Sequence, residues 1–94
     1  MEIKWLRKAT INFDDEYEWL YQENPQAAAE FARDVFRQVN LLVTHPALGR
    51  AGRVMGTREI VMHSFPYLIP YRIKNNEIHI FRVFHTRRRP PEKY

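Results

Sequence analysis

Apolar residues recur with two different periods along the chain, and the change of period divides it into elements. Near the start, Ile3 and Trp5 alternate with the charged residues Glu2 and Lys4, which is typical of a short strand. From about Ala9 the spacing becomes helical, with aromatic or aliphatic side chains at positions 13, 17, 20 and 21. We therefore expect one strand followed directly by a helix.

A second helix is predicted where Asn24 and Pro25 follow the first. Asparagine caps helices well, and proline suits the first helical turn, where its missing N–H costs little. A continuous apolar stripe at helical spacing follows, made of Ala28, Phe31, Ala32, Val35, Phe36, Val39, Leu42 and Val43. The pair His45-Pro46 ends it. Because almost no linker separates the two helices, they should form an antiparallel hairpin.

Three strands are predicted after a basic, glycine-containing loop over residues 47–56, at 57–63, 67–73 and 77–85. Asn75 and Asn76 suit a tight hairpin turn, because asparagine tolerates a positive φ. Pro70 removes a ladder hydrogen bond from the middle strand, so we expect an edge position or a bulge there. The order β-α-α-β-β-β predicts an α+β fold, with a helical hairpin packed on one face of an antiparallel sheet.

Length and composition restrict the class of protein. The 94 residues suffice for a single domain, 1–94, without a second core. Apolar runs are too short to span a bilayer and the first residues do not form a secretory signal, so we expect a cytoplasmic protein without membrane contact. The chain has no cysteine, and its histidines lack a metal-ligand spacing, so we expect no metal and no cofactor.

Charge is unevenly distributed and indicates the kind of partner. The formal net charge is +4, with carboxylates concentrated over residues 14–23 and arginines near the end of the sequence. A small basic domain attracts polyanions, and an acidic protein segment would serve as well as a nucleic acid.

Four passages in this order resemble the RelE/ParE toxin superfamily. They are Asn24-Pro25 with Ala28 and Phe31, then residues 45–50, then 56–61, and finally 67–72 leading to 80–88. Together they span nearly the whole chain. The resemblance implies a toxin of a type II toxin–antitoxin system of the plasmid-stabilisation type, neutralised by a cognate antitoxin. It also implies that DNA is contacted only indirectly, through the antitoxin.

The resemblance allows two activities. RelE-like members are ribosome-dependent mRNA endonucleases, whereas ParE-like members are known chiefly as inhibitors of DNA gyrase that act by protein contact. At positions that would correspond to the basic cluster of RelE stand Glu59, Val61 and Leu68, which cannot stabilise a phosphate transition state. YoeB-like nucleases place a tyrosine after the histidine, but here Thr86 follows His85. We therefore favour the ParE branch and a non-enzymatic gyrase inhibitor, with a RelE/YoeB-like ribosome-dependent endonuclease as the alternative. A family member with another target, or without toxicity, is a third possibility.

The candidate site residues follow from these alternatives. An endonuclease would use His85, Arg58, Arg72 and Arg82, since histidine can act as acid or base near neutrality. A strand-end histidine bonded to the backbone would fit the same position. For target binding we predict Arg82, His85, Arg87 and Arg88. The strand arginines would either form an anion-binding patch on the open face of the sheet or pair with Glu59 or Glu77.

For antitoxin binding we predict Trp19, Tyr21, Arg58 and Arg72. Trp19 and Tyr21 flank the apolar stripe of the first helix, so exposed rings there would anchor a partner. We expect both rings to be partly buried in the core.

Overall fold

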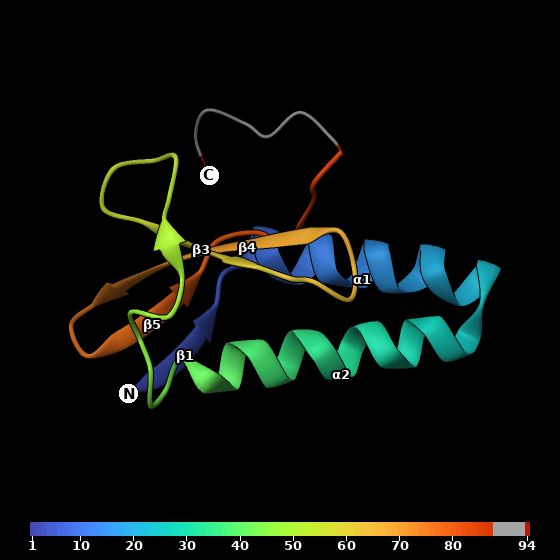
Figure 1. Cartoon of the computed structure of the whole chain (residues 1–94), viewed down its shortest axis with the longest axis horizontal. Coiled ribbons are helices and arrows are strands. Elements are labelled where there is room, and N and C mark those ends of the chain that lie inside the picture. Colours follow the sequence, from blue (N-terminus) through green and yellow to red (C-terminus); the bar gives the residue numbers. More distant parts are fainter. Residues whose placement is uncertain (88–93) are drawn as a thin grey trace.

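The computed structural model describes residues 1–87 and Tyr94, and it shows a helical hairpin on one face of a sheet (Figure 1). The elements are β1 (Glu2–Trp5), α1 (Arg7–Glu23), α2 (Pro25–Leu41), β2 (Arg50–Ala51), β3 (Arg58–Val61), β4 (Tyr67–Lys74), β5 (Glu77–Ile80) and β6 (Phe84–His85). In the sheet the order is β1-β5-β4-β3-β2, and β6 also pairs with β4. The predicted α+β architecture is confirmed. One pairing is parallel, that of β1 with β5, so the sheet is mixed.

Asn24 joins the two helices without a linker. Its backbone N–H donates to Leu20 O at 2.7 Å and so closes α1. Its side-chain Oδ1 accepts from the N–H groups of Gln26 and Ala27 at 3.1 and 3.2 Å, which caps α2. Pro25 occupies the first helical turn, as the sequence predicts.

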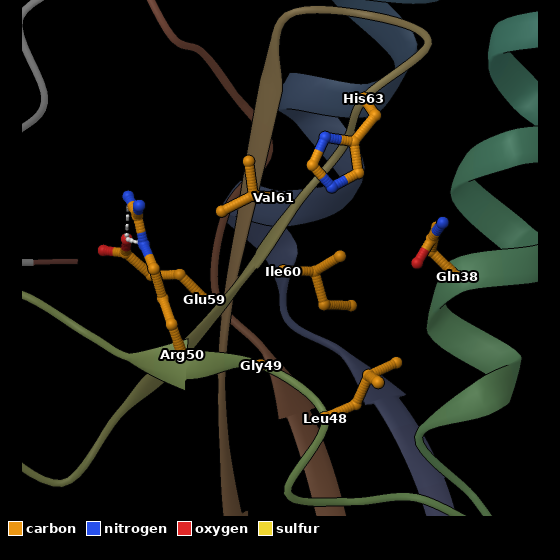
Figure 2. Close-up of a pocket in the computed structure, with 8 residues that line it drawn as sticks. All are labelled: Gln38, Leu48, Gly49, Arg50, Glu59, Ile60, Val61 and His63. Carbon is orange, nitrogen blue, oxygen red and sulfur yellow. Dashed lines mark hydrogen bonds and ion pairs between the residues drawn. The ribbon is translucent and has the colours of Figure 1, made fainter.

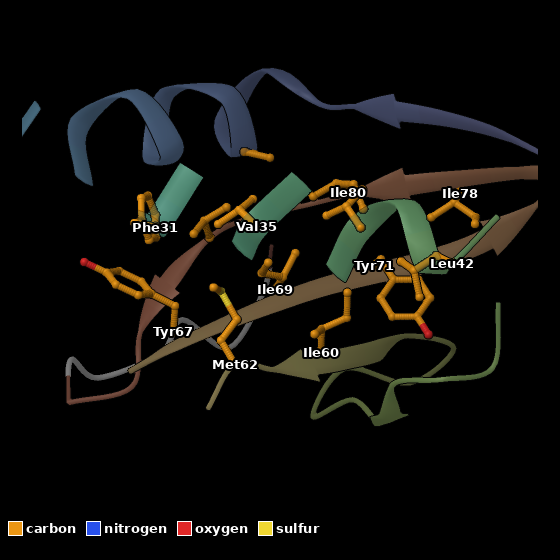
Figure 3. Close-up of a cluster of buried hydrophobic side chains, with 13 residues drawn as sticks. Phe31, Val35, Leu42, Ile60, Met62, Tyr67, Ile69, Tyr71, Ile78 and Ile80 are labelled. Carbon is orange, nitrogen blue, oxygen red and sulfur yellow. The ribbon is translucent and has the colours of Figure 1, made fainter. Parts of the chain in front are cut away.

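The core lies between α2 and the inner face of the sheet (Figure 3). Buried side chains of α2 meet buried side chains of β3, β4 and β5, among them Phe31, Val35, Val39, Leu42, Ile60, Ile69, Tyr71, Ile78 and Ile80. Two members of the predicted stripe do not belong to the core, since Phe36 is 47% exposed and Val43 is 40% exposed. The buried part of the stripe is therefore narrower than its apolar residues suggest.

Pro70 lies opposite a β-bulge in the middle of the sheet. Between the last pair of β5 and the first pair of β6, three residues (81–83) stand opposite Ile69 and Pro70. That is one residue more than a regular ladder holds. The N–H of Phe81 donates to Pro70 O at 2.9 Å, so proline turns toward the bulge, where its missing N–H interrupts no regular pairing. The predicted bulge is confirmed, and it allows proline in a central strand.

The β4–β5 hairpin turns on two asparagines with positive φ. Asn75 has φ 53° and Asn76 has φ 60°, and Lys74 pairs with Glu77 on either side. The tight turn predicted on these asparagines is confirmed, and positive φ at both central positions is the pattern of a type I′ turn. The turn fixes the register of β4 and β5, and with it the side chains that each strand presents on the two faces.

Candidate partner-binding site

The sheet face opposite the helices, here called the second face, is partly covered. Since Ile60, Ile69 and Tyr71 point into the core, strand alternation places Glu59, Leu68, Pro70 and Arg72 on the second face. Leu68 is only 7% exposed and Pro70 is buried. The sequence predicts that this face of the sheet is open. The middle of the face is instead covered by other parts of the chain, and the polar groups lie along its flanks.

Glu59 is the buried charge of this face and is held by two arginines. Its side chain is 2% exposed. Oε1 accepts from Nε and Nη2 of Arg50 at 3.3 and 3.2 Å, and Oε2 accepts from Nε and the backbone N–H of Arg53 at 2.9 and 3.3 Å. Burial alone raises the pKa of Glu59, but the bonds from Arg53, Tyr94 and Arg50 outweigh it and hold the pKa below its ordinary value. Because two guanidinium groups share one carboxylate, a positive excess remains.

Tyr94 lies across the middle of the second face. Its hydroxyl donates to Glu59 Oε2 at 3.1 Å, and its ring lies 5.5 Å from the ring of Phe81 and 6.0 Å from that of Phe84. Glu59 pairs with Pro70 from β3, and Phe81 bonds to the Pro70 carbonyl from the bulge, so two of the residues that Tyr94 contacts lie next to the proline. Burial, together with the bond to Glu59, raises the pKa of Tyr94. Tyr94 thus closes the region that the sequence predicts to be open.

Arg72 stands on the opposite flank of the second face. Its Nε donates to Nδ1 of His79 at 2.9 Å, and its guanidinium lies 5.3 Å from the ring centroid of Phe81. Because Nδ1 accepts, the ring proton is on Nε2, which faces Glu77 Oε1 at 3.1 Å. The hydrogen bond with His79 holds the pKa of Glu77 below its ordinary value. Arg72 therefore reaches Glu77 only through the imidazole.

Arg58 and Arg82 do not share a patch with Arg72. Arg58 points to the helix side of β3 and donates to the carbonyls of Gly49 and Ala47 at 2.9 and 3.4 Å. Arg82 lies in the bulge, so strand alternation no longer determines its direction. Its Nε donates to Asn12 Oδ1 of α1 at 2.6 Å, and its guanidinium lies 4.7 Å from the ring centroid of Phe84. The structure thus shows neither a common anion patch nor the expected pairs with Glu59 or Glu77.

His85 is bonded to the backbone. Its Nδ1 accepts the N–H of Arg87 at 3.1 Å, and its ring meets that of Tyr67 edge-on at 5.3 Å. This is the second of the two interpretations that the sequence leaves open. Arg87 is exposed, whereas the predicted Arg88 lies outside the described residues.

Trp19 and Tyr21 are expected to be partly buried in the core. This prediction is wrong for Trp19, which is 60% exposed. Tyr21 is 49% exposed, and its ring is stacked on that of Tyr17 with the centroids 6.2 Å apart. Figure 1 shows the reason: the connected ends of α1 and α2 project beyond the sheet, so the last turns of α1 have no strand to pack against. Both rings are available to a partner.

Glu59 and the two arginines bonded to it, Arg50 and Arg53, are here called the Glu59 cluster. A pocket of about 260 Å³ adjoins this cluster at the outer edge of β3 (Figure 2). Gln38 of α2 faces Ile60 across it, with Leu48 and His63 at its two ends and Arg50 bonded to Glu59 at its side. β2 pairs with β3 only at Arg58 and Glu59, so the edge beyond has no strand beside it in the described part of the chain. The pocket therefore joins a strand edge to a basic cluster.

Sequence reasoning missed Arg50, Arg53 and Tyr94 as members of the site. One signal was present, since a carboxylate in an otherwise apolar strand is rarely buried without cationic partners. Two arginines a few residues before Glu59 were the available partners. Nothing in the local sequence indicated that Tyr94 reaches the same carboxylate.

Among the described residues, no three or more histidine, aspartate or glutamate side chains come together in a way that could bind a metal ion. None of the helices in the described ranges has the length and apolar character needed to cross a bilayer.

Comparisons with known proteins relate the chain to a family model, to a curated protein and to a solved structure. A family model described as "ParE toxin of type II toxin-antitoxin system, parDE" matches residues 3–90. A curated protein of Sinorhizobium fredii (strain NBRC 101917 / NGR234), named "Putative toxin Y4kP", is 34% identical over 90 residues, covering 96% of this chain and 93% of its own. A solved structure titled "Chromosomal ParDE TA system from P. aeruginosa" superposes with a TM-score of 0.80 at 32% identity, covering 90% of this chain and 95% of that one.

Proposed function

The chain belongs to the ParE toxin family of type II toxin–antitoxin systems, and from this membership we propose that it inhibits DNA gyrase in the cytoplasm by protein contact. Membership also implies an antitoxin as partner. We propose gyrase as the target, the cytoplasm as the place of action, and the contact residues named below.

The side chains that a nuclease would need are engaged in other contacts, and this observation supports binding rather than catalysis. Glu59 is fully engaged by Arg50 and Arg53, and Leu68 is buried beside it. A metal-independent ribonuclease needs a base for the ribose hydroxyl and cations aimed at the phosphate. His85 is bonded to the backbone, and the three strand arginines point in different directions. Such a surface favours docking over phosphate chemistry.

For the target we propose Arg82, His85, Arg87 and Arg88 as contact residues. The described members of this set follow one another from the bulge through β6. Arg82 is held by Asn12 and Phe84, so its guanidinium loses little side-chain entropy when it meets a partner. Arg87 is exposed.

For the antitoxin we propose an acidic, amphipathic segment that folds on binding. Trp19 and Tyr21 offer exposed rings, and Arg72 offers a guanidinium on the second face. The excess charge of the Arg50–Arg53–Glu59 cluster adds to the attraction. We keep Arg58 in the antitoxin set, although its bonds to Gly49 and Ala47 give it a role in holding the loop before β2.

The test is a gyrase supercoiling assay with the purified chain, accompanied by induction in cells with and without the antitoxin. The double variant Arg87→Glu, Arg88→Glu should lose most of the inhibition, since it reverses two charges in the proposed contact. Arg33→Glu reverses an exposed charge on α2 and should inhibit like the parent. Translation arrest with cleavage of ribosome-bound mRNA, and no effect on supercoiling, would show the gyrase assignment to be wrong.

A further inference from the structure

Three aromatic rings from three elements line a pocket on the helix side of the molecule, away from the Glu59 cluster. The pocket measures about 260 Å³ and is lined by Trp5, Thr10, Phe13, Asp14 and Phe36. Trp5 comes from β1, Phe36 from α2 and the other three residues from α1. The pocket thus forms where the first strand meets both helices.

The rings are inclined to one another instead of stacked. Trp5 and Phe13 have centroids 6.0 Å apart at an interplanar angle of 71°, and Trp5 and Phe36 are 5.9 Å apart at 56°. Phe13 and Phe36 are 5.3 Å apart at 54°. The three rings are in mutual contact and form one aromatic wall of the pocket, and the negative potential of aromatic faces attracts organic cations.

The charge beside the rings is negative. Asp14 lines the pocket with an exposed carboxylate, and no ion pair to it is present among the described residues. The exposed carboxylates of Asp15 and Glu18 follow on the same helix. Within residues 1–87, the guanidinium groups that lie over aromatic rings are those of Arg72, over Phe81, and of Arg82, over Phe84, and neither ring lines this pocket. The aromatic wall of the pocket is therefore combined with a carboxylate that has no ion pair among the described residues.

The exposure of Phe36 is unusual for a residue on an apolar helix stripe. The side chain lies on the apolar stripe of α2, yet it is 47% exposed. A large exposed ring at the mouth of an apolar pocket is typical of a surface that a partner covers.

We propose that this aromatic pocket binds an arginine side chain presented by a partner protein. A guanidinium stacks on aromatic faces and can bond to the Asp14 carboxylate at the same time. An apolar side chain would fill the same volume but would desolvate the carboxylate without pairing it. The second face carries an excess of arginine, so the two surfaces take partner segments of opposite charge. This inference does not depend on gyrase being the target.

The experiment uses Trp5 as the reporter. The chain has two tryptophans, and Trp19→Phe, a change at an exposed position, leaves Trp5 as the sole tryptophan, which is excited selectively over the tyrosines. The probes are the peptide acetyl-Gly-Arg-Gly-amide and its citrulline counterpart, which has the same shape without the charge. The arginine peptide should change Trp5 fluorescence and the Trp5 indole N–H resonance, and the citrulline peptide should bind about tenfold more weakly.

Matched variants locate the contact. Asp14→Asn should weaken binding of the arginine peptide by about threefold, as expected for an exposed ion pair, and Phe36→Leu should weaken it further. Asp15→Asn removes a neighbouring exposed carboxylate that does not line the pocket, and should bind like the parent. Far-UV circular dichroism checks that each variant is folded.

Three outcomes would overturn the proposal. Equal affinity for the arginine and citrulline peptides would make the pocket a plain apolar site. Tighter binding of tetramethylammonium than of the arginine peptide would assign it to a small quaternary ammonium ligand. Absence of any response from Trp5 to either peptide would show that the rings only pack against one another.

Discussion

The substitution Glu59→Gln tests whether the buried carboxylate organises the second face. Glutamine keeps the size of the side chain, but one acceptor oxygen becomes an NH2 group. That group would face donors from Arg53 and Tyr94, or from Arg50, according to its rotamer. The variant therefore loses the charge-assisted bonds and places donor against donor on one side.

The magnitude follows from the burial of Glu59 and the exposure of its partners. Hydrogen bonds to a charged group contribute about 1.5–3 kcal/mol to stability. Glu59 is 2% exposed, but the Arg50 side chain is 57% exposed and that of Arg53 is 36% exposed, so solvent screens both ion pairs. We therefore expect a net loss of about 2 kcal/mol, which lowers the Tm of a domain of this size by roughly 8–16 °C.

The assay is urea unfolding followed by circular dichroism, at neutral pH and under acid conditions. The pKa of Glu59 is lowered in the folded state, so its contribution is present above the unfolded pKa near 4.5 and is lost as pH falls below it. Parent and Glu59→Gln should therefore converge in stability as pH falls through the lower folded pKa of Glu59. Glu18→Gln, at an exposed position of α1, is the control and should stay within about 0.5 kcal/mol of the parent. A loss below about 0.5 kcal/mol for Glu59→Gln, or a difference that does not change with pH, would refute this account of the cluster.

Three further predictions concern residues that position the same surfaces. Tyr71→Phe removes a hydroxyl that donates to Pro46 O at 2.7 Å and accepts from Gly49 N–H at 2.9 Å, so urea unfolding should show a loss of about 1–3 kcal/mol. Asn24→Ala removes the cap of α2 and should cost about 1 kcal/mol by the same measurement, whereas an unchanged midpoint would mean that the cap is dispensable. Because the pKa of Tyr94 is raised, the stability it contributes persists up to the ordinary tyrosine pKa of 10.0 and is lost as pH rises through the higher folded value. In a spectrophotometric titration, Tyr94→Phe should lack one phenol whose pKa is raised by burial and by the bond to Glu59, and an unchanged curve would contradict that environment.

Local rules of sequence account for much of the fold. The cap at Asn24, the turn at Asn75 and Asn76 and the bulge opposite Pro70 each depend on a few neighbouring residues, and each was predictable. The candidate partner-binding site instead depends on contacts between residues that are far apart in the sequence. Tyr94 meets Glu59 from 35 positions away, and no periodic pattern encodes such a contact.

The direction of individual side chains was less predictable than the elements that carry them. Arg82 lies in the bulge that accommodates Pro70, and its Nε donates to Asn12 of α1, which is 70 positions away in the sequence. Exposure of Trp19 depends on how far the hairpin projects past the sheet, which is set by the relative lengths and packing of several elements. Such features follow from tertiary structure and not from local propensity.

The parallel pairing of β1 with β5 also governs when the protein can fold during translation. Ile3 pairs with Ile78, so the first strand emerges from the ribosome long before its neighbour exists. At about 5–20 residues per second, the intervening chain takes roughly 4–15 s to synthesise. Throughout that interval the first strand has no partner, and the sheet is incomplete.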